Sequence, residues 1–288
     1  MIKVALISGG RESTAMVKKV EDEFGKDFFD EKMFANTGDD PHGVATIEHL
    51  EKYCGWKVTT VKSKHFPIVK YYEDAHVIDK LDVKDSGHAM PFHAQKDCST
   101  KFKITPVRNY LREKYGKKEK FEIYYGFSFS KKEVERKMRV TKPEYQVGYA
   151  TYKFPLIDMK IDRKLCGDIC KELMGFIPEP SLCDMCFERT QGEWKKFYKD
   201  NPVRAKEVMK FEESSHIFKV FGYGLNGVPL RKLFGLEPLD KEQKKLFDTY
   251  TPEKIDAIMD TEILTKKISV GCNCMEDVRI FDKVDVDE

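Results

Sequence analysis

The 288-residue chain carries 51 lysine and arginine residues against 49 aspartate and glutamate residues, a formal net charge of +2, and 41% of its residues are hydrophobic. With so small a net charge, the protein is not expected to attract nucleic acid through its overall charge alone. The apolar content is sufficient for a large buried core. The first apolar run, residues 2–7, is too short for a secretory signal, and no segment approaches the roughly 18 apolar residues of a membrane span. We therefore expect a cytoplasmic protein with no membrane partner.

The first part of the chain alternates between apolar segments of strand length and amphipathic segments of helix length. Strands are predicted at residues 2–7, 32–38, 56–61 and 121–127, and helices at residues 13–24, 43–55 and 104–116. Gly55 and Gly116 stand where two of these helices end, as helix-terminating glycines do. This alternation predicts an α/β domain over residues 1–160, with a parallel sheet covered by helices on both faces.

The pattern changes after residue 160, where the apolar spacing becomes helical. Helices are predicted at residues 162–175, 188–200, 202–213, 240–248 and 252–260. We therefore expect a second, mostly helical, cysteine-containing region over residues 161–288. Residues 82–98 show little periodicity and are predicted to form a long loop near the rim of the sheet.

The segment LISGGRESTA, residues 6–15, lies between the first predicted strand and the first predicted helix. In an open α/β sheet this turn is a favoured phosphate site, because glycines allow close approach of the backbone and the helix N-terminus attracts anions. Gly9 and Gly10 would let the backbone approach a phosphate closely. The neighbouring side chains that could also bind it are the hydroxyls of Ser8, Ser13 and Thr14 and the guanidinium of Arg11. The alternative is a tight turn in which Ser13 only caps the helix.

These residues also resemble a known pattern. Ser8-Gly9-Gly10-Arg11-Glu12-Ser13 resembles the PP-loop of the adenine nucleotide α-hydrolase superfamily, Ser-Gly-Gly-X-Asp-Ser, with Glu12 in place of the usual aspartate. Further segments are similar, in the same order, to motifs of the phosphoadenosine phosphosulfate (PAPS) reductase branch: FANTGDD at 34–40, DCSTKFKITPVRNYL at 97–111, GFSFSKKEVER at 126–136, YKFPLIDM at 152–159, which resembles a strand motif, and PEPSLCDMCFER with the following Glu-Trp at 178–194.

The resemblance implies a Rossmann-like sheet of the HUP type that binds an adenine nucleotide, ATP or PAPS, with Mg²⁺. It assigns phosphate contacts to Ser8, Gly9, Gly10, Glu12 and Ser13, and adenosine contacts to Asn36, Thr37 and Gly38. The carboxylate of Glu12 is expected to orient Mg²⁺ or water. Lys103 and Arg136 are candidate catalytic clamps for phosphate or sulfate, with solvated surface charges as the alternative for both.

Several of the eight cysteines stand close together in sequence. Cys183 and Cys186 follow a turn-forming segment and have the spacing of metal ligands. Together with Cys98 and one or both of Cys272 and Cys274 they would supply the thiolates for a [4Fe-4S] cluster, which the resemblance favours, or for zinc; unligated thiols are the remaining alternative. Cys166 and Cys170 lie four residues apart on one predicted helix and are expected to be buried.

Three functions are compatible with these features. The preferred one is ATP pyrophosphatase-type activation coupled to sulfur transfer onto a tRNA, a DNA or a small molecule. The second is reduction of PAPS or adenylyl sulfate, although the Glu-Cys-Gly-X-His segment of such reductases is missing from the sequence. The third is a module that binds or senses a nucleotide without turnover. A homodimer is compatible with each of the three.

Overall fold

The structure is a computed structural model, which describes residues 1–74, 89–91, 97–142, 148–215, 218, 224–225, 227–241 and 243–244. Its strands are β1 (Ile2–Leu6), β2 (Glu31–Asn36), β3 (Thr59–Lys62), β4 (Phe121–Tyr124) and β5 (Ala150–Lys153). They form one sheet in the order β3-β2-β1-β4-β5, and every neighbouring pair is parallel. The predicted α/β class with a parallel sheet is confirmed.

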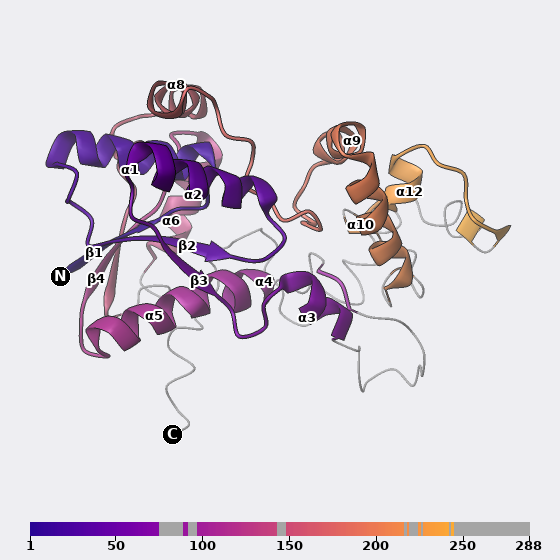
Figure 1. The fold of residues 1–288 in the computed structure, drawn as a ribbon, viewed down its shortest axis with the longest axis horizontal. Coiled ribbons are helices and arrows are strands. Elements are labelled where there is room, and N and C mark those ends of the chain that lie inside the picture. Colours follow the sequence, from indigo (N-terminus) through magenta and orange to yellow (C-terminus); the bar gives the residue numbers. More distant parts are fainter. Residues whose placement is uncertain are drawn as a thin grey trace. The chain divides into compact units, whose positions relative to one another are not determined.

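Helices connect the strands, and further helices follow the last strand in the sequence (Figure 1). In the first half of the chain they are α1 (Arg11–Phe24), α2 (Pro41–Cys54), α3 (Ile68–Asp74), α4 (Asp97–Ser99), the π-helix η1 (Thr100–Ile104), α5 (Thr105–Tyr115) and α6 (Lys131–Val140). In the second half they are α7 (Pro155–Asp158), α8 (Arg163–Met174), α9 (Gln191–Asp200), α10 (Pro202–Ser214) and α12 (Leu230–Leu233). None of the helices in the described ranges has the length and apolar sequence needed to cross a membrane.

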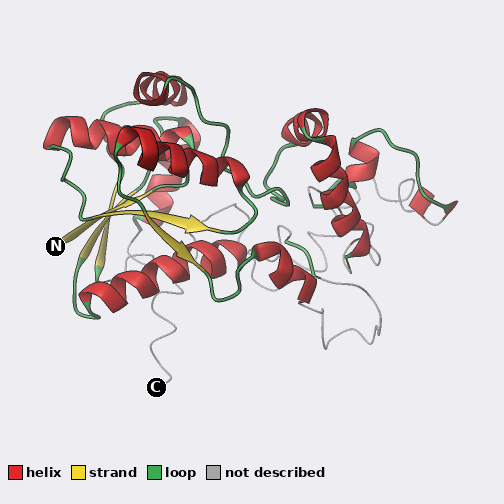
Figure 2. Cartoon of the chain, viewed as in Figure 1, coloured by secondary structure: helices red, strands yellow, loops and turns green. Residues whose placement is uncertain are grey.

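The sheet has a hydrophobic core on each face. Neighbouring residues of β1 alternate between the two, since Ala5 packs in one core and Val4 in the other. The core around Ala5 contains residues of α1, α2 and α8, and the core around Val4 contains residues of α5 and α6. Figure 2 shows the strands between these layers of helices. Both faces of the sheet are therefore covered, as is usual for a parallel sheet.

The described chain divides into two compact units, and the boundary differs from the predicted one at residue 160. The first unit holds Met1–Phe66 and Ser99–Leu182, and the second holds Pro67–Cys98 and the described residues from Cys183 onward. Helix α8 belongs to the first unit because its buried face, including Ile169, packs against α1 and α2. The predicted boundary therefore falls inside the first unit.

Two local predictions are wrong for identifiable reasons. Residues 152–159 resemble a strand motif, but β5 ends at Lys153 and Pro155–Asp158 form the one-turn helix α7. Pro155 lacks an N–H for a sheet ladder and has a backbone angle suited to the first position of a helix, so the strand ends at Lys153. The end of the predicted loop at 82–98 is also helical, because α4 runs without a break into η1 and α5. The predicted helix at 252–260 lies outside the described residues.

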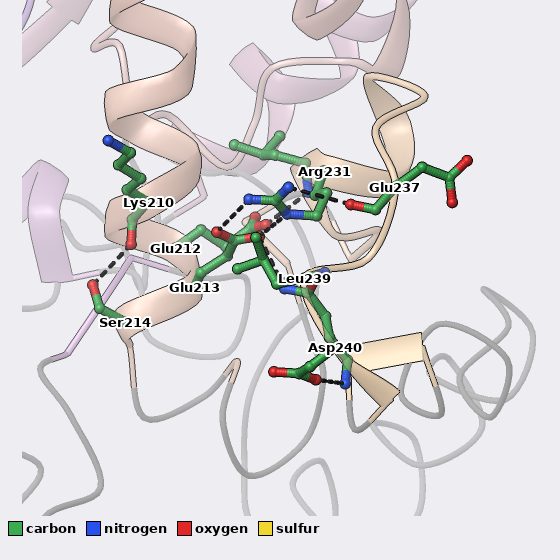
Figure 3. Close-up of polar contacts among 10 residues, drawn as sticks. Lys210, Glu212, Glu213, Ser214, Arg231, Glu237, Leu239 and Asp240 are labelled. Carbon is green, nitrogen blue, oxygen red and sulfur yellow. Dashed lines mark hydrogen bonds and ion pairs between the residues drawn. The ribbon is translucent and has the colours of Figure 1, made fainter.

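The second unit contains a fully buried carboxylic acid. Glu212, near the end of α10, is 0% exposed, and its two carboxylate oxygens accept the backbone N–H groups of Leu225 and Leu230 at 2.6 and 2.7 Å. The adjacent Glu213 forms an ion pair with Arg231 instead (Figure 3). Burial raises the pKa of Glu212 to about 8, although the two backbone hydrogen bonds lower it.

Candidate functional site

The carboxyl edge of the sheet brings together three connections around α1. The strand order reverses at β1, which has β2 on one side and β4 on the other, and such a reversal leaves a crevice at the strand ends. The β1–α1 loop lies at this position. The β4–α6 connection touches it through Gly126, where a Cβ atom would lie 2.6 Å from the backbone of Ser13. Only glycine allows this approach.

The β1–α1 loop is organised by its own serine side chains. The Oγ of Ser13 accepts the N–H of Ser8 and donates to the carbonyl of Gly10, both at 3.1 Å. The Oγ of Ser8 accepts the N–H of Gly10 at 3.2 Å and lies 3.2 Å from the Oγ of Ser13. These bonds fold the loop into a compact turn that the hydroxyls of Ser8 and Ser13 hold together. A hydroxyl that rotates its proton out of these bonds can donate to a phosphate oxygen.

Gly9 holds the turn against α2. Its φ angle of +81° lies in the left-handed region, and a Cβ atom would stand 2.5 Å from the carbonyl oxygen of Gly43. Both the backbone angle and the space therefore require glycine. The prediction that Gly9 permits close backbone approach is consistent with this geometry, although the approaching backbone is that of α2.

The N-terminus of α1 has no side-chain cap. Its N-cap residue is Gly10, whereas α2, α6, α8, α9 and α10 are capped by Asp40, Ser130, Asp162, Thr190 and Asn201. An uncapped helix start leaves amide N–H groups and the positive end of the helix dipole for an external acceptor. The alternative expectation, in which Ser13 caps this helix, is wrong, because the hydroxyl of Ser13 bonds to Ser8 and Gly10 instead. The Oγ1 of Thr14 is buried and has no hydrogen-bond partner within the described part of the chain.

Charged groups flank the first turn of α1. Glu12, predicted to orient Mg²⁺ or water, forms an ion pair with Arg163 of α8, with Nε and Oε1 3.0 Å apart. The Arg163 side chain is 59% exposed, so solvent weakens this pair and a competing cation can displace it. The guanidinium of Arg11 makes no ion pair or hydrogen bond with the residues that the structure describes. Arg11 is thus the available cation beside the turn.

The β2–α2 connection supplies the second wall of the crevice. The side-chain oxygen of Asn36 accepts the N–H of Gly38 at 2.8 Å and so fixes the turn. Thr37 and Asp39 are buried. Asn36, Thr37 and Gly38, the predicted adenosine contacts, therefore lie together at the end of β2.

Asp40 connects this wall to a residue that the sequence did not single out. One carboxylate oxygen caps α2 by accepting the N–H of Gly43 at 2.8 Å. The other lies 2.5 Å from the hydroxyl of Ser181, which also lies 2.6 Å from the carbonyl oxygen of Ser8. Ser181 occurs in the sequence only as part of the cysteine-containing motif at 178–194, and nothing in that motif signals a contact with a loop more than 170 residues earlier in the chain.

The two predicted clamps lie on helices outside this turn. Arg136 of α6 stacks on the ring of Phe127 at 4.3 Å and pairs with Glu133 at 3.4 Å. Among the described residues its ion pairing is limited to Glu133. Lys103 is exposed on η1. The described contacts of Arg136 thus give it a packing role in α6, and the clamp role of both residues stays a prediction.

The predicted thiolate ligands are only partly within the described structure. Cys183 and Cys186 bracket a tight turn in which the N–H of Cys186 donates to the carbonyl of Cys183 at 3.0 Å. Cys98 lies on α4, and all three thiols are half-buried. Within the described ranges no group of three or more ligating side chains is assembled. Cys272 and Cys274 lie outside the described residues.

Cys166 and Cys170 are buried on α8, as predicted. The thiol of Cys170 donates to the carbonyl of Arg11 at 3.3 Å, so it packs beneath the start of α1. Burial raises the pKa of both thiols to about 12, which keeps them protonated and unreactive at neutral pH. They are structural residues of the core around α1.

Comparison of the chain with protein-family models, with curated proteins and with solved structures found no match. The function must therefore be argued from the site itself.

Proposed function

We propose that the β1–α1 turn binds the phosphates of an adenine nucleotide and that the protein belongs to the PP-loop superfamily, with a Rossmann-like sheet of the HUP type. The observation that carries the proposal is the uncapped, glycine-started helix α1 at the strand-order reversal. This arrangement offers amide N–H groups and a positive dipole end to an anion, at the edge where α/β proteins bind ligands. The strand order β3-β2-β1-β4-β5 is also that of the first five strands of doubly wound dinucleotide-binding folds.

Individual residues have separate roles in this proposal. The N–H groups of the first α1 turn and the hydroxyls of Ser8 and Ser13 hydrogen-bond the phosphate oxygens. Arg11 adds a positive charge that no described side chain neutralises. The end of β2, from Asn36 to Gly38, faces the nucleoside. Mg²⁺ prefers carboxylate and phosphate oxygens, and Glu12 is the carboxylate of this turn, so Glu12 would hold the metal after release from Arg163.

The preferred reaction is nucleotidyl activation followed by sulfur transfer. An oxygen of the acceptor, on a tRNA, a DNA or a small molecule, attacks the α-phosphorus of ATP, and the bond to the bridging oxygen breaks so that pyrophosphate leaves with the electron pair. A sulfide-level nucleophile then displaces AMP, and the carbon–oxygen bond is replaced by a carbon–sulfur bond without net oxidation. The helix N-terminus stabilises the charge that develops on pyrophosphate. The Cys183–Cys186 turn, with Cys98, would hold a cluster or a zinc ion if further ligands complete the site.

A second candidate, binding without turnover, is favoured by the Glu12–Arg163 ion pair. A carboxylate occupied by an arginine is a poorer ligand for Mg²⁺ than a free one, so the turn would hold the nucleotide without activating it. Pyrophosphate release from ATP and Mg²⁺ by the wild type separates the two candidates: release above background is expected of an enzyme, and background release is expected of a sensor. In the sensor case, Arg163→Gln frees Glu12 and is expected to raise release, which would show that the ion pair keeps the turn inactive.

The proposed function is tested by calorimetric titration of the full-length protein with ATP and with inorganic pyrophosphate in the presence of Mg²⁺. Ser13→Ala removes three hydrogen bonds of the turn and is expected to lower the affinity for both ligands by on the order of 10-fold. Ser214→Ala is the matched control, because Ser214 is exposed on α10, away from the turn in sequence, and its hydroxyl donates to the carbonyls of Lys210 and Phe211 on its own helix. A wild-type protein that binds neither ligand at millimolar concentration would refute the proposal.

A further inference from the structure

The contacts of Ser181 point to a role in the β1–α1 turn that the sequence does not suggest. Its hydroxyl lies 2.6 Å from the carbonyl oxygen of Ser8 and 2.5 Å from Oδ2 of Asp40. Ser181, the turn and Asp40 all belong to the first unit. The contact joins the end of β1, the start of α2 and the segment that follows α8.

The Ser8–Gly9 peptide is the group that Ser181 holds. A trans peptide points its C=O and its N–H in opposite directions, so a fixed Ser8 carbonyl also fixes the N–H of Gly9. Glycine at φ +81° has no Cβ to restrict the neighbouring peptide, and this peptide can therefore rotate between two orientations. The hydrogen bond from Ser181 selects the orientation in which the Ser8 carbonyl faces Asp40 and Gly43 and the N–H of Gly9 faces away from them.

The two orientations differ in what they offer to an anion. In the observed orientation the N–H of Gly9 has no acceptor among the residues that the structure describes, and it is available to a ligand. In the opposite orientation the Ser8 carbonyl would take its place and repel phosphate oxygens. A single peptide rotation thus exchanges a donor for an acceptor at the same position.

Asp40 shares the hydroxyl of Ser181 with the Ser8 carbonyl. Its carboxylate is buried, with one oxygen bound to the N–H of Gly43 and the other to Ser181. The hydroxyl of Ser181 has one proton and two acceptors, so it can donate to only one of them at a time. An Asp40→Asn side chain that presents its NH₂ group to Ser181 would direct the hydroxyl proton to Ser8 and strengthen the hold on the peptide.

We propose that Ser181 is a positioning residue that keeps the Ser8–Gly9 peptide in the orientation that binds phosphate. This inference rests on the proposed function for its ligand, but its structural content concerns the turn alone. Ser181 touches the loop and is not itself expected to contact the nucleotide.

Two measurements on the full-length protein test it. The first is amide hydrogen exchange of peptides covering residues 7–14 without nucleotide, compared between wild type, Ser181→Ala and Ser214→Ala. Ser181→Ala is expected to raise exchange in this segment by about 10-fold, because one net hydrogen bond that restrains the turn is lost, and Ser214→Ala is expected to leave it unchanged. Ser181→Thr retains the hydroxyl and is expected to restore slow exchange.

The second measurement is titration with inorganic pyrophosphate, ATP and adenosine. Ser181→Ala is expected to weaken the binding of pyrophosphate and of ATP by on the order of 10-fold and to leave the affinity for adenosine unchanged. Ser181→Thr is expected to retain the wild-type affinity for all three ligands. Unchanged exchange at residues 7–14 in Ser181→Ala would overturn the inference, and so would an equal loss for adenosine, which would indicate general unfolding. If wild type binds no phosphate ligand while Ser181→Ala still raises exchange, the positioning role stands and the proposed function fails.

Discussion

The buried Glu212 leads to a pH-dependent stability that can be isolated by one substitution. In the unfolded chain a glutamate has a pKa near its ordinary value of 4.5, whereas in the folded protein burial raises the pKa of Glu212 to about 8. Between these values the folded protein keeps a proton that the unfolded chain releases. The contribution of this bound proton to the free energy of unfolding is therefore complete below pH 4.5 and is lost as the pH rises toward 8.

The magnitude follows from the linkage relation. A single proton changes the free energy of unfolding by about 1.4 kcal/mol for each pH unit, so the second unit should lose roughly 3–5 kcal/mol between pH 4.5 and pH 8. The neighbouring charges do not cancel this effect, because Glu213 raises the pKa further and Arg231 pairs with Glu213 (Figure 3). Glu212→Gln removes the titration but leaves only one acceptor for the two backbone N–H groups. The variant is thus expected to lose about 1–3 kcal/mol at pH 5.

Urea unfolding followed by tryptophan fluorescence measures this difference. The chain has two tryptophans, Trp56 in the first unit and the fully buried Trp194 in the second, so a Trp56→Phe background reports on the unit that holds Glu212. The parent should be more stable than Glu212→Gln at pH 5, and this difference in the free energy of unfolding should close and then reverse in sign as the pH rises to 8. Glu237→Gln makes the same chemical change at an exposed position and should show a constant gap. A gap for Glu212→Gln that does not change with pH would refute the reasoning.

Further predictions concern the first unit. Gly9→Ala should destabilise it by about 3 kcal/mol or more, because the new Cβ would lie 2.5 Å from the carbonyl oxygen of Gly43 and the φ angle of Gly9 is positive. Gly55→Ala is the control: Gly55 also has a positive φ, +69°, but a Cβ there would meet no atom within 4 Å, so the loss of stability should be only about 1 kcal/mol. Equal losses of stability in thermal unfolding would contradict this reasoning. In a native thiol titration at pH 8, Cys166→Ala with Cys170→Ala should react with as many equivalents of reagent as wild type, since burial raises the pKa of both thiols to about 12. A loss of one or two equivalents would show that they are accessible.

The sequence was sufficient for those parts of the fold that depend on local signals. The β1, α1 and β2 segments, and the end of α2 at Gly55, follow from apolar periodicity and a left-handed glycine. The start of α2 lies at Pro41, after the Asp40 cap and two residues before the predicted start at residue 43. Pro155 also carried a local signal, the preference of proline for the first turn of a helix, which the strand interpretation of residues 152–159 overlooked. The membership of α8 in the first unit carried no such signal, because it depends on burial against α1.

The candidate site divides in the same way. Sequence alone determined the β1–α1 turn, since Ser8, Gly10 and Ser13 are within five positions of one another and their hydrogen bonds follow from local geometry. Only the tertiary structure decided that Glu12 pairs with Arg163 and that Ser181 holds the Ser8 carbonyl. A side chain that meets its partner across 141 or 173 positions leaves no periodicity in the sequence, because the parallel sheet and its packed helices, rather than chain neighbours, set the distance between them.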